Sequence, residues 1–168
     1  MKALIIYDSM FGNTERVAQA MATALTDQNQ VVARRVGDVN PAEFTGLDLL
    51  IVGSPTQGFR PTPAIKKLLA SLPAQGLQGV KVAAFDTRIA IEEVGSRFLT
   101  VMVNFFGYAA QPIAKRLQKK AGALIAAPEG FIVKGKEGPL KEGELERAAQ
   151  WARQLTAAIS APAATIIA

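Results

Sequence analysis

The sequence predicts an α/β protein built on a doubly wound, five-stranded parallel sheet in the order 2-1-3-4-5, with helices on both faces. Short apolar runs alternate with segments of helical character five times along the chain. The 168 residues, 49% of them apolar, suffice for one sizeable core but not for two full-sized domains. We therefore expect a single domain over residues 1–160 and a frayed tail over residues 161–168.

The strands and helices each have a local signal. The strands are short apolar runs at residues 2–7, 30–36, 47–53, 81–85 and 123–127, and the last has a further apolar run at 131–133. The helices are predicted over residues 15–25, 62–69, 109–120 and 143–159. Thr62 is a capping residue followed by a proline in the first turn, and Gly122 marks the end of the third helix.

Polar loops follow the first, third and fourth strands. They begin at Asp8, Ser54 and Asp86, and the second of them is rich in Gly and Pro. In the order 2-1-3-4-5 the direction of winding changes between strands one and three, so these loops meet at one edge of the sheet. The sequence therefore predicts a binding site at this edge.

The composition excludes several kinds of chemistry. The chain contains no Cys and no His, which removes disulfides, thiolate nucleophiles, imidazole bases and Cys-ligated metals. We predict no catalytic residue and no metal site, and we expect any demanding chemistry to come from a bound cofactor.

The charge indicates the kind of partner. A net charge of +5 attracts anionic molecules. No basic platform interleaved with aromatic residues accompanies this charge, so we do not expect nucleic-acid binding. No apolar stretch is long enough to span a bilayer and the first residues do not resemble a signal peptide, so we expect a cytoplasmic protein.

The loop after the first strand has the character of a phosphate-binding loop. It lacks the Lys of a Walker A loop and the three glycines of a dinucleotide fingerprint. It offers instead Ser9, Asn13 and Thr14 around Gly12, directly before a helix. Hydroxyls, backbone amides and a helix N-terminus suit a terminal phosphomonoester.

The pattern Ser9-x-x-Gly12-Asn13-Thr14 after the first strand resembles the FMN phosphate loop of the flavodoxin family, with Phe11 where the family usually has Thr. The resemblance covers essentially the whole chain. It implies FMN as the cofactor, with three groups of contact residues. These are a phosphate loop (Ser9, Met10, Phe11, Gly12, Asn13, Thr14), one side of the isoalloxazine ring (Pro55, Thr56, Gln57, Gly58, Phe59) and its pyrimidine edge (Asp86, Thr87, Arg88).

The chain departs from the family in two ways. Flavodoxins usually flank the flavin with Trp and Tyr and are acidic, whereas Trp151 lies in the last helix, no Tyr stands directly after Asp86, and the chain is basic. If Arg60 or Arg88 approaches the ring, the reduced flavin is stabilised and its potential is less negative than in acidic flavodoxins. Phe59 is either a ring-stacking residue or a hydrophobic anchor for its loop.

Other features have simpler interpretations. A receiver domain would need an acidic pair after the first strand, an Asp after the third and a Lys after the fifth. This chain has Asp8 alone after the first strand, and Gly53-Ser54-Pro55 and Ala126-Ala127-Pro128 at the other two ends. Glu92 and Glu93 fit solvated carboxylates at a helix start. The basic group of Lys115, Arg116, Lys119 and Lys120 fits the solvent-exposed face of a helix, and the alternative is a contact with an acidic partner or a phosphate-bearing substrate. The apolar segment 98–106 is either ordinary core, a lid beside the flavin, or the contact of a homodimer.

These observations favour an FMN-binding electron-transfer protein. Its partner would be a redox protein, which the basic charge leads us to expect to be acidic, or a small-molecule acceptor. The alternatives are an FMN-dependent NAD(P)H:quinone-type oxidoreductase and a binding module of this fold without flavin, since fold alone does not decide among them.

Overall fold

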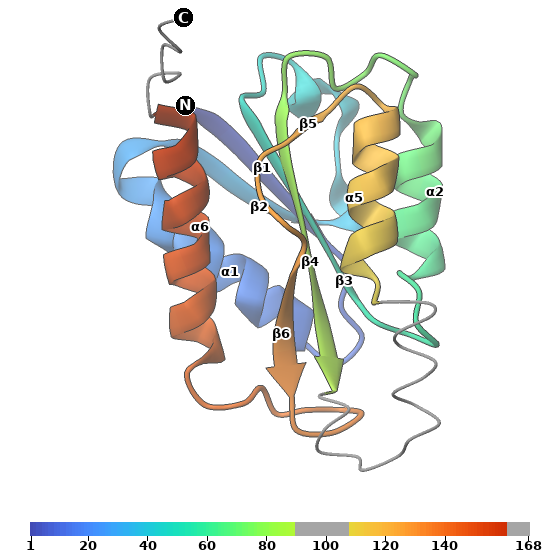
Figure 1. Ribbon diagram of the computed structural model, residues 1–168, viewed down its shortest axis with the longest axis vertical. Helices are drawn as coiled ribbons and strands as arrows, with labels where there is room; N and C mark the ends of the chain where they lie inside the picture. The colour runs from blue at the N-terminus through green and yellow to red at the C-terminus, as the bar shows by residue number, and fades with distance from the viewer. Residues whose placement is uncertain (90–107, 161–168) are drawn as a thin grey trace, which may run out of the picture.

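The computed structural model describes residues 1–89 and 108–160 of the chain (Figure 1). The predicted segment 98–106 and the predicted tail 161–168 lie outside these residues. The strands are β1 (Lys2–Tyr7), β2 (Gln30–Arg35), β3 (Leu49–Pro55), β4 (Lys81–Ile89), β5 (Ala123–Leu124) and β6 (Glu129–Val133). The α-helices are α1 (Asn13–Leu25), α2 (Pro63–Ser71), α5 (Ala110–Lys119) and α6 (Glu144–Ser160).

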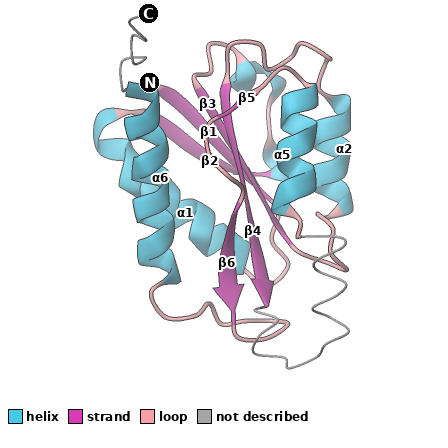
Figure 2. Cartoon of the chain, viewed as in Figure 1, coloured by secondary structure: helices cyan, strands magenta, loops and turns pink. Residues whose placement is uncertain are grey.

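The predicted sheet order is confirmed. The strands run β2-β1-β3-β4-β5, every pairing is parallel, and β6 also pairs with β4. Helices α1 and α6 cover one face and α2 and α5 the other (Figures 1 and 2). Short 3-10 helices follow α1 and β2, at residues 26–28, 36–38 and 41–44.

The two faces of the sheet bury separate hydrophobic cores. In β1, Ala3, Ile5 and Tyr7 belong to the core under α1 and α6, whereas Leu4 and Ile6 belong to the core under α2 and α5. This alternation is what a strand buried on both faces requires, because successive side chains point to opposite sides.

Aromatic rings fill the core under α1 and α6. Phe131 of β6 packs edge-to-face against both Phe85 of β4 and Trp151 of α6, with ring centroids 5.9 and 6.2 Å apart. Gly53 in β3 leaves the space that Phe85 occupies, since a Cβ at Gly53 would lie 2.0 Å from its ring. Trp151 is therefore a core residue.

The first part of the fifth strand is shorter than predicted, since β5 ends at Leu124, whereas the predicted resumption at residues 131–133 is confirmed by β6. The fifth strand is divided into β5 and β6, and Pro128, which has no N–H to donate to a ladder, stands between them. The second piece pairs with β4 from Phe85 to Ile89. Because it has this partner, β4 continues four residues beyond the predicted end at Phe85, and the expected loop at 86–88 is strand.

Candidate functional site

The loop between β1 and α1 forms one wall of the site. Gly12 is the N-cap of α1 with φ 80°, a left-handed conformation that glycine adopts at little cost, and no side chain caps the helix within the described residues. The first amides of α1 therefore have no intrahelical partner and face the loop. Ser9 is buried, and its Oγ is the one buried side-chain polar atom of the described residues without a hydrogen-bond partner.

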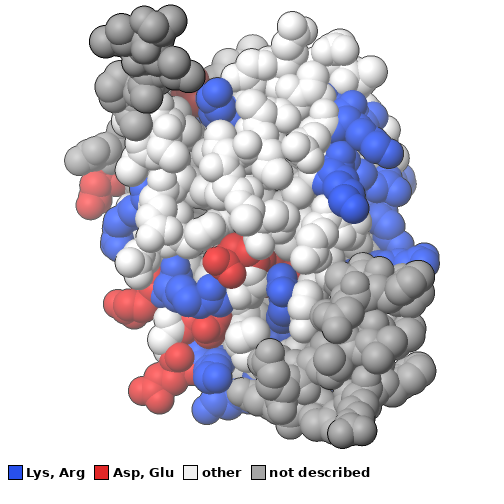
Figure 3. Space-filling model, viewed as in Figure 1, with Lys and Arg blue, Asp and Glu red and all other residues white. Residues whose placement is uncertain are grey.

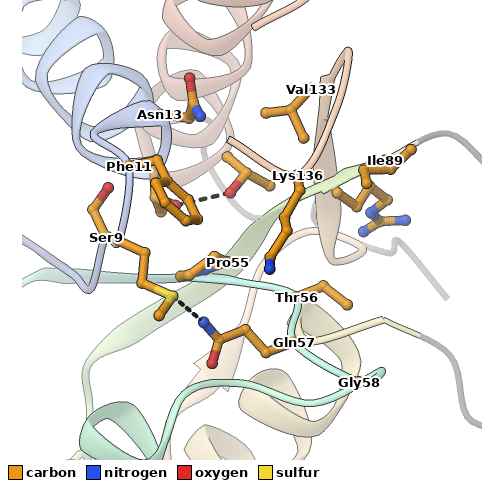
Figure 4. Close-up of a pocket in the computed structure, with 14 residues that line it drawn as sticks. Ser9, Phe11, Asn13, Pro55, Thr56, Gln57, Gly58, Ile89, Val133 and Lys136 are labelled. Carbon is orange, nitrogen blue, oxygen red and sulfur yellow. Dashed lines mark hydrogen bonds between the residues drawn. The ribbon is translucent and has the colours of Figure 1, made fainter. Parts of the chain in front are cut away.

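A cavity of about 480 Å³ lies over this loop. Its walls come from the ends of β1, β3 and β4 and from the loop after β6 (Figure 4). The lining residues are Ser9, Met10, Phe11, Asn13, Thr14, Pro55, Thr56, Gln57, Gly58, Thr87, Arg88, Ile89, Val133 and Lys136. The predicted loops after β1 and β3 thus meet the end of β4, which was predicted as a loop, at one cavity on the expected edge of the sheet.

Hydrogen bonds hold the walls together. The hydroxyls of Thr14 and Thr87 are 2.8 Å apart, which joins the start of α1 to β4. The Thr56 N–H donates to the Thr87 carbonyl at 2.9 Å, and the Gln57 amide donates to the Met10 sulfur across the cavity (Figure 4). The cavity is therefore framed by segments that are fixed to one another.

Asp86 and Arg88 form a buried ion pair. Asp86 is 0% exposed, and its carboxylate accepts from Arg88 Nε at 2.5 Å and from the Ala110 N–H at 2.8 Å. Burial raises the pKa of Asp86, and the charge and hydrogen bonds of Arg88 oppose this shift. The Arg88 guanidinium also lies 3.8 Å from the centroid of the Tyr108 ring. This arrangement ties β4 to the start of α5 and offsets the charge of Arg88.

Three predicted site residues do not line the cavity. Gly12 is the N-cap of α1, and Asp86 is fully buried in the protein interior. Phe59, with φ 65°, lines a neighbouring hollow together with Arg60. Of the two arginines considered near the ring, only Arg88 therefore reaches the cavity.

Sequence reasoning missed Ile89, Val133 and Lys136. Ile89 belongs to the extension of β4, and the other two come from the end of β6 and the loop after it. The side chain of Lys136 points into the cavity toward Pro55 and Thr56 (Figure 4). The rule that the carboxyl ends of all parallel strands share one edge could have found this loop, had it been applied to the fifth strand.

Asn13, the first residue of α1, holds the loop after β6 in place. Asn13 Nδ2 donates to the carbonyl of Glu137 at 2.9 Å, which fixes the loop after β6 against the start of α1. This bond explains how a loop so distant in sequence comes to line the same cavity.

Fold and site define a doubly wound α/β protein whose cavity opens at the switch point of the sheet, over a glycine-capped helix N-terminus. Residues 5–151 match the family model described as flavodoxin. The chain therefore belongs to the flavodoxin family.

Solved structures with the same fold include several flavodoxins. Oxidised flavodoxin 1 from Bacillus cereus is 17% identical, with a TM-score of 0.72, 94% of this chain and 98% of that chain being covered. A flavodoxin from the domain Archaea is 20% identical, with a TM-score of 0.70 and coverage of 96% and 100%. Rubredoxin oxygen:oxidoreductase from Desulfovibrio gigas is 24% identical, with a TM-score of 0.66, and 95% of this chain matches 37% of that chain.

Residues 1–89 and 108–160 contain no group of acidic side chains arranged to hold a metal ion. None of the helices in these ranges is both long and apolar enough to cross a bilayer.

Proposed function

We propose that the cavity binds FMN and that the protein carries electrons on this flavin. The observation that supports the proposal most directly is the Ser9 hydroxyl, which is buried, lines the cavity and has no partner among the described residues. Unsatisfied buried polar groups are uncommon in native proteins, and a phosphate oxygen would satisfy this one.

The phosphate would be held by the Ser9 hydroxyl, the loop amides and the N-terminus of α1. Backbone amides at a helix N-terminus bind anions because the helix dipole is positive there. The left-handed Gly12 turns these amides toward the loop without a side chain that would compete for them. The fit is that of a monophosphate, since the loop supplies no lysine.

The remaining walls suit a planar, partly apolar ring. Pro55, Ile89 and Val133 supply apolar surface, and Gln57 supplies an amide. The volume of about 480 Å³ lies within the range of cofactor sites. The predicted ring contacts of residues 55–59 and 86–88 stay predictions. Among residues 86–88, we expect Thr87 and Arg88 to contact the ring more than Asp86, because only these two line the cavity.

FMN supplies reversible reduction, and the protein supplies position and electrostatics. Thr14 and Thr87 fix the loop that holds the phosphate against the strand that would border the ring. Met10 and Phe11, 65% and 45% exposed, lie at the mouth of the cavity, where another molecule could approach the flavin. The partner we propose is an acidic redox protein, and the cytoplasmic location stays a prediction from the sequence.

The test compares FMN binding by the wild type and by Ser9→Ala. We expect flavin to be released on denaturation and the dissociation constant to rise about 10- to 100-fold in Ser9→Ala, since a hydrogen bond to a charged group contributes about 1.5–3 kcal/mol. Ser71→Ala is the control, because the Ser71 hydroxyl donates to Leu68 at the exposed end of α2. An unchanged affinity in Ser9→Ala would refute this phosphate site.

Mixing the flavin-bound protein with NADPH under anaerobic conditions tests the role of the flavin. A carrier is reduced only when a separate reductase is added. Reduction by NADPH alone, followed by turnover with a quinone, would show the oxidoreductase instead.

A further inference from the structure

The layer formed by α2 and α5 concentrates the positive charge of the protein. Residues 49–85 and 108–128 contain no Asp or Glu and carry eight of the 19 Lys and Arg. The rest of the chain therefore has 11 cations against all 14 acids. Because α2 and α5 lie together on one face of the sheet, this charge gathers on one side of the molecule, where Figure 3 shows blue side chains without red ones among them. We call this side the basic face.

The basic face contains a hollow close to the cavity. The hollow has a volume of about 330 Å³, and four cations line it: Arg60, Lys66, Lys115 and Arg116. The turn at residues 57–60, closed by two backbone hydrogen bonds between Gln57 and Arg60, separates it from the cavity. Gln57 and Gly58 line the cavity, whereas Phe59 and Arg60 line the hollow. A molecule bound in the hollow would therefore stand beside the flavin site.

The cations around the hollow are available to a partner. No Asp or Glu among the described residues forms an ion pair with any of the four. Elsewhere Arg34, Arg88 and Arg147 each pair with a carboxylate. On the basic face, Lys120 is occupied, because it donates to the Ala70 and Leu72 carbonyls at the end of α2.

An acidic protein fits this face better than a membrane or a nucleic acid. The exposed large hydrophobic residues of the described chain are Met10, Phe11 and Ile89, and all three line the cavity. Within the described residues, the helices of the basic face therefore offer no large apolar side chain for insertion into a bilayer and no aromatic row for stacking bases. Apolar residues at the cavity mouth with charged residues beside them match the core and rim of a protein interface.

We propose that the basic face, centred on the hollow of Arg60, Lys66, Lys115 and Arg116, is the docking surface of an acidic redox protein. Opposite charge would steer the partner to this face and orient its redox centre toward the cavity. The proposal rests on the proposed electron-carrier function and adds the place and charge of the partner's contact.

The first experiment needs no flavin. An oligoglutamate peptide is titrated into flavin-free wild type, Arg116→Glu and Arg153→Glu by calorimetry at low ionic strength. Arg116 and Arg153 are both exposed helical arginines, the first on α5 and the second on α6 of the opposite face, so the two variants have the same net charge. We expect the affinity to fall about threefold or more in Arg116→Glu and to change little in Arg153→Glu.

The second experiment measures electron transfer by stopped flow. The reduced flavin-bound protein is mixed with an acidic blue-copper protein, whose Cu(II) takes one electron and becomes Cu(I). We expect the second-order rate constant to fall with added salt, and to be about threefold or more lower in Arg116→Glu than in Arg153→Glu at low ionic strength. A basic cytochrome c should show the opposite dependence on salt.

The outcomes separate the proposals. Equal losses in the two variants would show that net charge alone acts and would overturn the docking surface. Tighter binding of duplex RNA or phosphatidylserine vesicles than of the peptide, lost in Arg116→Glu, would also overturn it in favour of that class. Failure of the FMN titration would refute the flavin function, whereas the peptide titration would still test the face.

Discussion

Lys136 brings a positive charge into the cavity that no described carboxylate neutralises. The sequence led us to consider Arg60 and Arg88, but Arg60 lines the neighbouring hollow and Arg88 is paired with Asp86. A cation near the ring stabilises the reduced, more negative flavin. We therefore expect Lys136, which sequence reasoning missed, to have the effect on the reduction potential that was predicted for Arg60 or Arg88.

Lys136→Gln should make the flavin potential more negative. Unit charges several ångströms apart at the protein surface interact by about 0.5–2 kcal/mol, which corresponds to roughly 20–90 mV for one electron. A redox titration of the flavin-bound protein measures the shift. Lys134→Gln is the matched control, since Lys134 is exposed and does not line the cavity. Equal shifts in the two variants would contradict this role of Lys136.

The Asp86–Arg88 pair should be costly to break. Arg88→Met leaves a fully buried carboxylate without its cation, and we expect the free energy of unfolding to fall by about 3–5 kcal/mol at neutral pH. Urea unfolding measures this loss, with Arg116→Met as an exposed control expected to change stability by about 0.5 kcal/mol or less.

The same variant has a defined dependence on pH. Burial raises the pKa of Asp86 in the folded state above the unfolded value, so protonation favours folding. The loss in Arg88→Met should therefore be fully present above the raised pKa and shrink as the pH falls below it. A loss that stays constant down to the ordinary pKa of an aspartate would contradict this explanation.

The loop between β6 and α6 completes the site through close contact with α1. Gly138 has φ 108°, and a Cβ there would lie 2.6 Å from Asn13 Nδ2. The bond from Asn13 to the Glu137 carbonyl thus needs a glycine beside it.

Gly138→Ala should displace this loop and weaken FMN binding. The strained backbone and the clash with Asn13 should cost about 1–3 kcal/mol in unfolding free energy. Gly135→Ala is the matched control in the same loop, because its Cβ would meet only the Gly138 carbonyl at 3.6 Å. Urea unfolding and a flavin fluorescence titration measure both variants. Equal affinity for FMN in the two would show that the loop position does not matter.

The elements also show what periodicity could and could not predict. The apolar runs predicted β1 and β3, because both strands are buried on both faces of the sheet. The end of β4 was missed because Asp86 and Arg88 are charged, and only their mutual pairing allows a strand to bury them. No local sequence pattern marks the loop at 134–140 as part of the site, because its contact with Asn13 is purely tertiary.

The net charge of the protein can be counted from the sequence, but the position of that charge on the surface cannot. A net charge of +5 is compatible with an even distribution, whereas the fold brings the two acid-free segments 49–85 and 108–128 to one side. In the α5 region, Lys115 and Arg116 stand four residues before Lys119 and Lys120, and like charges at this spacing destabilise a helix. Repulsion between these side chains thus opposes the stability of α5.

Lys115→Glu should therefore stabilise the protein while weakening the docking of an acidic partner. The variant replaces a repulsive pair of lysines with a glutamate four residues before Lys119, which is the favourable order along the helix, so we expect a gain of about 0.5–1 kcal/mol at low salt. Urea unfolding at low salt and near 1 M salt, where the Debye length is about 3 Å, measures the gain and its screening. A gain that salt leaves unchanged would assign it to helix propensity, and a loss would show that Lys115 is not repelled by the basic face.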